Sequence, residues 1–171
     1  MNKLSFRIFL SAAVLGLSLP GMAVAESKLI DVFSDWSAFT DTDRGKKICY
    51  IGSAPVKEEG KYAKRGDTFV LVTHRPAEKS VGVISIAAGY AYKKGSDVQV
   101  VIGGKTFALF SEGDNGWAED TKTDRALIRA MRGGSRMVVK GVSGRGTRTT
   151  DTYSLKGFSA AYKAASKACG L

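Results

Sequence analysis

The chain has 171 residues, of which 26 are basic and 16 acidic, so its formal net charge at neutral pH is +10. This length is enough for a single domain with a proper hydrophobic core. After the first 25 residues no apolar stretch approaches the roughly 20 residues that a transmembrane helix needs, so we expect no transmembrane segment in the mature chain.

The first 25 residues have the layout of a bacterial secretory signal peptide. Lys3 and Arg7 form a short basic start, residues 8–19 are almost entirely apolar, and Ala23-Val24-Ala25 is typical of a cleavage site. We expect cleavage after this tripeptide and a mature chain, residues 26–171, that forms a single domain. The expected location is the periplasm, with outer-membrane association or secretion as further options.

The charge of the mature chain limits its partners. The signal holds two basic residues and no acidic one, so the mature formal charge is +8. Such an excess favours anionic surfaces through an attraction that fades with salt. In an exported protein, nucleic acid is a poor partner, whereas lipopolysaccharide, anionic lipid, a host polyanion or a host surface protein fits. The basic residues are scattered, so a charge that serves only solubility is an equal alternative.

The chain has only two cysteines, Cys49 and Cys169. In an oxidising compartment an even number of cysteines predicts a disulfide, and two cysteines allow one intramolecular pairing. The bond would close a loop of about 120 residues, for which the chain-entropy model gives an upper figure of about 4–5 kcal/mol. Two separate free thiols are the alternative.

Most of the mature chain predicts short strands. We expect them at residues 36–40, 47–53, 68–74, 81–88, 97–102, 105–110, 136–142 and 149–155. Gly103-Gly104 between two of these segments indicates a two-residue hairpin, because the primed turns need positive φ. The polar stretches 57–67 and 111–116 are expected to be loops.

Two short helices are predicted. In residues 121–132, Thr121 and Asp124 resemble a capping box, and an apolar face follows at Leu127, Ile128 and Met131. The second helix, residues 158–168, carries one apolar stripe made of Phe158, Tyr162, Ala165 and Cys169. Cys169 should therefore face the sheet. Many short strands and only two helices predict a mostly β protein with an antiparallel β-sandwich fold.

The chain offers little catalytic chemistry. His74, the only histidine, would be the base of a Ser-His-Asp hydrolase, but no G-x-S-x-G elbow surrounds any serine, so a structural or surface role is preferred. One histidine and two distant cysteines do not make a zinc site, and the acidic cluster in residues 112–120 misses the calcium-loop spacing. We therefore predict no catalytic residue, no metal site and no cofactor.

Two features are candidates for binding a partner. The glycine-rich segment Gly141-x-x-Gly144-x-Gly146 links two strands, so it predicts a hairpin loop that could present Arg145 and Arg148 to an anionic partner. A solvated hairpin tip is an equal alternative. Trp117, in a polar loop, is the better contact candidate of the two tryptophans, because Trp36 in the first predicted strand is expected to be in the core.

Several segments resemble a known family. They are F-S-D-W-S-A-F (33–39), K-I-C-Y (47–50), K-R-G-D-T-F-V-L-V-T-H-R-P (64–76), K-K-G-S-D-V-Q-V-V-I-G-G-K-T-F-A-L-F (93–110) and Y-S-L-K-G-F-S-A-A-Y (153–162). In this order and spacing they resemble the invasion-associated locus B family of alphaproteobacterial envelope proteins, over nearly all of the mature chain. The resemblance implies an immunoglobulin-like β-sandwich, export and, for the founding pathogen proteins, a role in host-cell entry. It supplies no established enzyme activity and no catalytic residues.

The sequence thus favours a non-enzymatic exported β-sandwich that binds a protein or an anionic surface partner, with a contribution to host-cell invasion or association as one role. Two alternatives stay open. One is a structural periplasmic protein whose loss shows only under stress, and the other is a hydrolase that uses His74.

Overall fold

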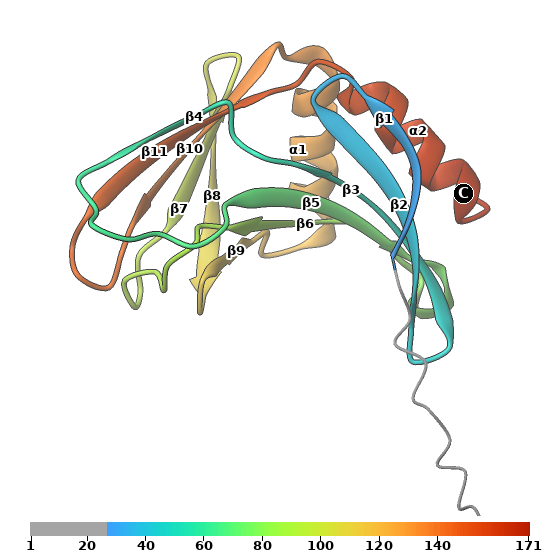
Figure 1. Ribbon diagram of the computed structural model, residues 1–171, viewed down its shortest axis with the longest axis horizontal. Coiled ribbons are helices and arrows are strands. Elements are labelled where there is room, and N and C mark those ends of the chain that lie inside the picture. The colour runs from blue at the N-terminus through green and yellow to red at the C-terminus, as the bar shows by residue number, and fades with distance from the viewer. Residues whose placement is uncertain (1–26) are drawn as a thin grey trace, which may run out of the picture.

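The computed structural model describes residues 27–171, so the predicted signal peptide lies outside the described residues. The described part contains eleven strands and two α-helices (Figure 1). The strands are β1 (Lys28–Phe33), β2 (Trp36–Asp43), β3 (Lys46–Ser53), β4 (Lys57–Gly60), β5 (Phe69–Arg75), β6 (Ser80–Ala87), β7 (Val98–Ile102), β8 (Lys105–Glu112), β9 (Asn115–Trp117), β10 (Arg136–Val142) and β11 (Arg148–Ser154). The helices are α1 (Thr121–Gly133) and α2 (Phe158–Ala168), with a single 3₁₀ turn at Pro76–Glu78.

The strands form one antiparallel sheet in the order β1-β2-β3-β5-β6-β9-β8-β7-β10-β11-β4. Strand β8 belongs to both halves of this sheet, because its first part pairs with β7 and its last residues pair with β9. Figure 1 shows the half with β2, β3, β5 and β6 set at a steep angle to the half with β7, β10 and β11. The predicted fold class, a mostly β antiparallel sandwich with two short helices, is confirmed.

The two helices cover different parts of the sheet. Helix α2 packs on β1, β2 and β3, and α1 packs on β6. Trp36, at the start of β2, is completely buried and meets the Phe158 ring of α2 edge to face, with 5.0 Å between the ring centres. Its indole Nε1 donates a hydrogen bond of 2.9 Å to the Ser154 carbonyl oxygen in β11. The predicted core position of Trp36 is confirmed, and this residue ties both sheet halves to α2.

The structure contains the predicted disulfide between Cys49 and Cys169. Cys49 lies in the middle of β3 and is fully buried, and Cys169 directly follows α2. The two Cα atoms are 5.9 Å apart although 120 positions separate the residues in sequence. The bond therefore holds the C-terminal helix on the central strands of the sheet.

Three strands lie where the sequence predicts none. Strand β1 precedes the first predicted strand, β4 lies in the predicted loop 57–67, and β9 lies at the end of the predicted loop 111–116. Strand β4 is exposed at every residue, and β9 has only three residues, so neither shows the alternating apolar pattern that identifies a strand. Strand β1 has a register shift at Leu29–Asp31 that breaks its alternation.

Two local predictions had different outcomes. The Gly103-Gly104 hairpin is confirmed, because both glycines have positive φ (54° and 81°) and join the paired ends of β7 and β8. The capping box at Thr121 is wrong: Asp120 caps α1, and its side chain accepts a hydrogen bond of 2.7 Å from the Thr123 backbone N–H. Asp124 instead is buried and accepts a hydrogen bond from the Ile84 backbone N–H in β6.

Candidate functional site

A pocket of about 640 Å³ opens where the β10–β11 hairpin meets the segments before β5 and after β6. The basic residues that line it are Lys61, Lys64 and Arg145, and all three are exposed. No aspartate or glutamate of the described chain lines it. The volume is in the range of small-molecule sites, about 300–1,000 Å³. We call this cavity the basic pocket.

Direct backbone hydrogen bonds hold the walls of the basic pocket together. The Gly66 N–H donates to the Gly89 carbonyl oxygen at 2.8 Å, and the Gly144 N–H donates to the Ala91 carbonyl oxygen at 2.9 Å. Gly89 has a φ of +70°, and a Cβ atom there would lie 2.3 Å from the Gly66 oxygen. Only glycine allows this close approach, so the three wall segments have a fixed spacing.

A buried ion pair lies beside the basic pocket. The Arg65 guanidinium donates two hydrogen bonds, of 2.7 and 2.6 Å, to the two carboxylate oxygens of Asp151 in β11. Its Nε donates a third, of 2.7 Å, to the Ala88 carbonyl oxygen. The two side chains are 3% and 4% exposed. Burial alone would lower the pKa of Arg65, but the hydrogen bonds and charge of Asp151 outweigh this effect and raise it, so the guanidinium stays charged.

Two tyrosine rings line the basic pocket next to this ion pair. The Arg65 Cζ atom lies 5.3 Å from the ring centre of Tyr62 and 5.2 Å from that of Tyr90. The Tyr90 hydroxyl shares a hydrogen bond of 2.5 Å with the Thr149 hydroxyl. Burial raises the pKa of Tyr90, so its phenol is neutral at physiological pH. The arginine thus fixes two aromatic side chains at the wall of a cationic cavity.

The two arginines that the sequence predicts as contact residues line different but neighbouring hollows. Both are exposed, as expected of a hairpin that presents them to solvent. Arg145, at the hairpin tip, lines the basic pocket. Arg148, the first residue of β11, lines two adjoining hollows of about 180 and 560 Å³, and the larger of these shares Lys61 and Thr147 with the basic pocket. The two arginines and Lys61 therefore border one connected basic surface.

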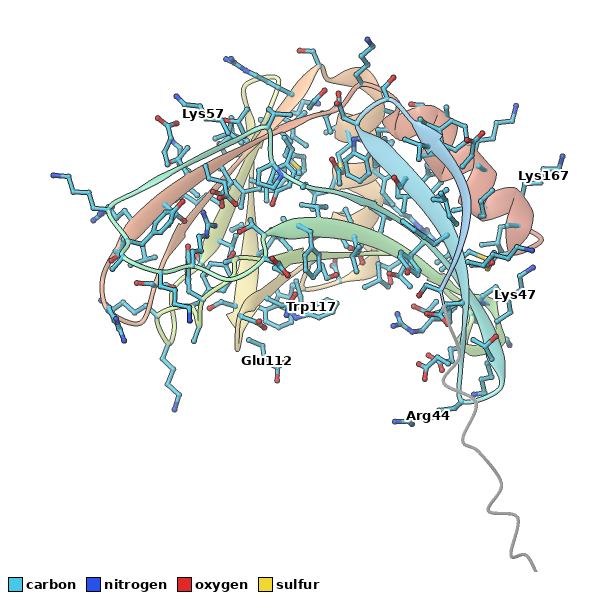
Figure 2. The ribbon with its side chains drawn as sticks, viewed as in Figure 1. Arg44, Lys47, Lys57, Glu112, Trp117 and Lys167 are labelled. Atoms are coloured by element: carbon cyan, nitrogen blue, oxygen red, sulfur yellow. A yellow bond between two sulfur atoms is a disulfide. The ribbon has the colours of Figure 1, made fainter. Side chains whose placement is uncertain are left out.

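The predicted loop position of Trp117 is wrong. Trp117 ends β9 and pairs with Ser85 of β6 and Phe110 of β8. Its side chain is half-buried and lies on the same face of the sheet as its partner Ser85, opposite the buried Ile84 and Ile86. Figure 2 shows it below β9. It does not line the basic pocket, so a contact role for Trp117 would belong to a different surface.

Comparison with protein families places the chain in a known group. The family model described as "Invasion associated locus B (IalB) protein" matches residues 36–166. The chain belongs to the invasion-associated locus B family. The match spans all three walls of the basic pocket and the Arg65–Asp151 pair.

One solved member of this fold is the crystal structure of invasion associated protein B from Bartonella henselae. It is similar to this chain with a TM-score of 0.51 and 15% sequence identity, over 78% of this chain and 91% of the Bartonella chain. At this identity the likeness shows the shared fold alone. No curated protein sequence matches the chain.

In this invasion-associated locus B protein, His74 is an internal structural residue. It is fully buried opposite Cys49 in the sheet, and its ring meets the Tyr162 ring edge to face at 5.0 Å. Its Nδ1 accepts a hydrogen bond from the Gly82 N–H at 3.1 Å, so the neutral ring carries its proton on Nε2, which lies 3.2 Å from the Ser166 hydroxyl. With both nitrogens occupied and no exposed surface, the ring cannot reach a substrate.

The structure makes the stability of the protein depend on the protonation of His74. Burial lowers the pKa of His74 from its ordinary value of 6.5, so the folded chain keeps the ring neutral where the unfolded chain protonates it. The unfolded state then binds more protons, so the free energy of unfolding should fall as the pH drops from about 7 to about 5.5. Denaturant titration at both pH values measures this change. A His74→Gln variant should show a flatter pH dependence, and equal slopes in the two proteins would contradict the assignment.

Sequence reasoning did not find most of the basic pocket. The stretch predicted to be a polar loop contains Lys61, Tyr62, Lys64 and Arg65. Tyr90 follows a predicted strand. Their only sequence signal is the run of two lysines and an arginine in residues 61–65, which is too short to indicate a charged patch.

In residues 27–171 no three histidine, cysteine, aspartate or glutamate side chains gather as metal ligands would. Neither helix of that part is both long and apolar enough to cross a membrane.

Proposed function

We propose that this protein is exported and uses the basic pocket to bind an anionic component of the cell envelope, such as lipopolysaccharide or anionic lipid, without a chemical reaction. One observation supports this most strongly: Lys61, Lys64 and Arg145 line one cavity, to which no carboxylate of residues 27–171 contributes. Arg148 extends the basic surface into the adjoining hollow. Arginine forms bidentate hydrogen bonds with phosphate and carboxylate groups, which suits such a partner.

The proposed location is the periplasm, with outer-membrane association or secretion as further options. The signal-peptide pattern of residues 1–25 supports export. Association with a host cell or a host surface protein is a further proposed role, in keeping with the name of the family.

A binding role also fits the chemistry of the interior. The only histidine of the chain is fully buried with both ring nitrogens engaged, which removes the base that a Ser-His-Asp hydrolase would need. We therefore propose a binding protein rather than a hydrolase.

Binding to anionic vesicles tests this function. The exported protein should bind lipopolysaccharide and phosphatidylglycerol vesicles at 0.1 M salt, and binding should weaken clearly at 1 M salt, where the Debye length falls from about 10 Å to about 3 Å. An exposed ion pair contributes roughly 0.2–1 kcal/mol. Arg145→Ala/Arg148→Ala should therefore weaken binding about 2- to 30-fold. Vesicle co-sedimentation measures both effects.

The matched control is Arg125→Ala/Arg129→Ala, which removes two exposed arginines from α1 and lowers the net charge equally. It should bind nearly as the unmodified protein does. If both double variants bind with the same affinity, binding depends on the net charge of the protein and not on a particular site. If the protein fails to bind at low salt, a structural periplasmic role takes precedence.

A further inference from the structure

The basic pocket combines two kinds of lining that a simple phosphate site does not need. Positive charge comes from Lys61, Lys64 and Arg145, and the rings of Tyr62 and Tyr90 supply flat carbon surface. The remaining lining residues are all glycine, alanine, serine or threonine, so they are small or carry a hydroxyl group. The ligand should therefore have an acidic group, a compact ring and groups that form hydrogen bonds.

The lining excludes a hydrocarbon chain as the main occupant. No valine, leucine, isoleucine, methionine or phenylalanine lines the cavity in the described residues. An acyl chain gains its binding energy from contact with such side chains. If the anionic partner is a lipid, the basic pocket must hold its headgroup and leave the chains outside.

The aromatic surface is preorganised. The Arg65 guanidinium lies over both tyrosine rings, at 5.3 Å and 5.2 Å from their centres, and it donates two hydrogen bonds to the Asp151 carboxylate. Asp151 neutralises the charge of Arg65, so this arginine positions the rings rather than holding the ligand acid. A binding surface that is fixed before the ligand arrives loses less conformational entropy on binding.

Hydroxyl groups complete the wall on the hairpin side. The Ser143 oxygen accepts a hydrogen bond of 3.1 Å from the Thr147 N–H, which leaves the hydroxyl hydrogen of Ser143 free to donate. Thr147 lines the same wall and carries a second hydroxyl group. Such groups can exchange hydrogen bonds with the hydroxyls of a sugar.

We propose that the basic pocket recognises an acidic sugar, that is, a pyranose ring that carries a phosphate, sulfate or carboxylate. The tyrosine rings contact the sugar ring, and the lysines and Arg145 hold its acidic group. This inference rests on the proposed function and names the chemical class of its ligand. A glycolipid headgroup and an acidic polysaccharide both supply this unit.

Titration of the isotope-labelled exported protein, followed by NMR, tests the proposal with four small probes: glucose 6-phosphate, glucuronic acid, glucose and inorganic phosphate. Glucose 6-phosphate and glucuronic acid should bind at least about tenfold more tightly than glucose or phosphate, a difference of about 1.4 kcal/mol. A longer glycolipid headgroup and an acidic oligosaccharide, compared next, distinguish the two sources of the ligand.

Variants separate the two halves of the proposed recognition. Tyr62→Ala should remove the preference for glucose 6-phosphate over inorganic phosphate but leave phosphate binding, and Tyr62→Phe should keep the preference. Lys64→Gln should weaken binding of both acidic ligands alike. The controls Phe110→Ala and Lys105→Gln change an exposed aromatic ring and an exposed lysine of β8, outside the pocket. They should change neither the preference for glucose 6-phosphate over inorganic phosphate nor the affinity for the acidic ligands.

Two results would overturn the inference in different ways. If inorganic phosphate binds as tightly as glucose 6-phosphate, the basic pocket is a general anion site: the acidic-sugar inference fails and the proposed function stands. If none of the anionic probes binds and the protein also ignores anionic vesicles, both fail.

Discussion

Asp151→Ala is expected to lower the free energy of unfolding by about 3–5 kcal/mol, because it leaves a buried guanidinium without its counter-charge. Asp151 is 4% exposed and accepts both terminal hydrogen bonds of Arg65. The nearest other carboxylate, that of Glu58, lies 4.0 Å from the guanidinium and is 38% exposed, so it cannot replace the buried one. Chemical denaturation of the purified protein measures the loss.

The chain offers a matched control for this substitution. Glu59 forms an ion pair of 2.9 Å with Lys57 on the exposed edge strand β4. Glu59→Ala should change the unfolding free energy by no more than about 1 kcal/mol, as is usual for surface pairs. Arg65→Met/Asp151→Leu should be less destabilised than the sum of its two single variants. If Asp151→Ala unfolds like Glu59→Ala, the pair contributes little to stability.

Cys169→Ser is expected to lower the free energy of unfolding by about 2–5 kcal/mol. The bond to Cys49 restricts nearly the whole described chain in the unfolded state, since 120 positions separate its ends. It also holds α2 against β1, β2 and β3, where Phe158 and Ala165 are completely buried. The comparison needs denaturant titrations of both proteins under oxidising conditions.

A reductant provides the control for the disulfide. Under reducing conditions the unmodified protein should fall to the stability of the Cys169→Ser variant, while the variant should not change. Non-reducing peptide mapping should find the two cysteine peptides linked. Two thiols that can be alkylated in the exported protein would contradict the bond.

The fold class could be predicted from local sequence patterns, and the structure contains the elements that these patterns predict. The Gly103-Gly104 turn needs positive φ, and the apolar stripes at Leu127–Met131 and Phe158–Cys169 need a buried helix face, so sequence alone predicts these elements. The pattern fails where a strand has no buried face of its own. Strand β4 pairs along the edge of β11, and its four residues are all exposed.

The candidate site was only partly predictable for a different reason. Arg145 stands out because glycines surround it, but the basic pocket arises when three segments far apart in sequence meet. Arg65 and Asp151 are 86 positions apart, and neither residue carries a local signal of its partner. The close approach of Gly66 and Gly89 likewise depends on the packing of two loops. Such contacts belong to tertiary structure, which periodicity does not encode.

The most direct test of anion binding at the basic pocket is NMR chemical-shift mapping of purified residues 26–171 with a soluble, anionic fragment of lipopolysaccharide. The backbone resonances that shift on titration should cluster in the three wall segments, residues 61–66, 89–91 and 143–149, and Arg145→Ala should reduce these shifts. Shifts confined to another surface, such as β1 or the Trp117 face, with the wall segments unchanged, would contradict the proposed site.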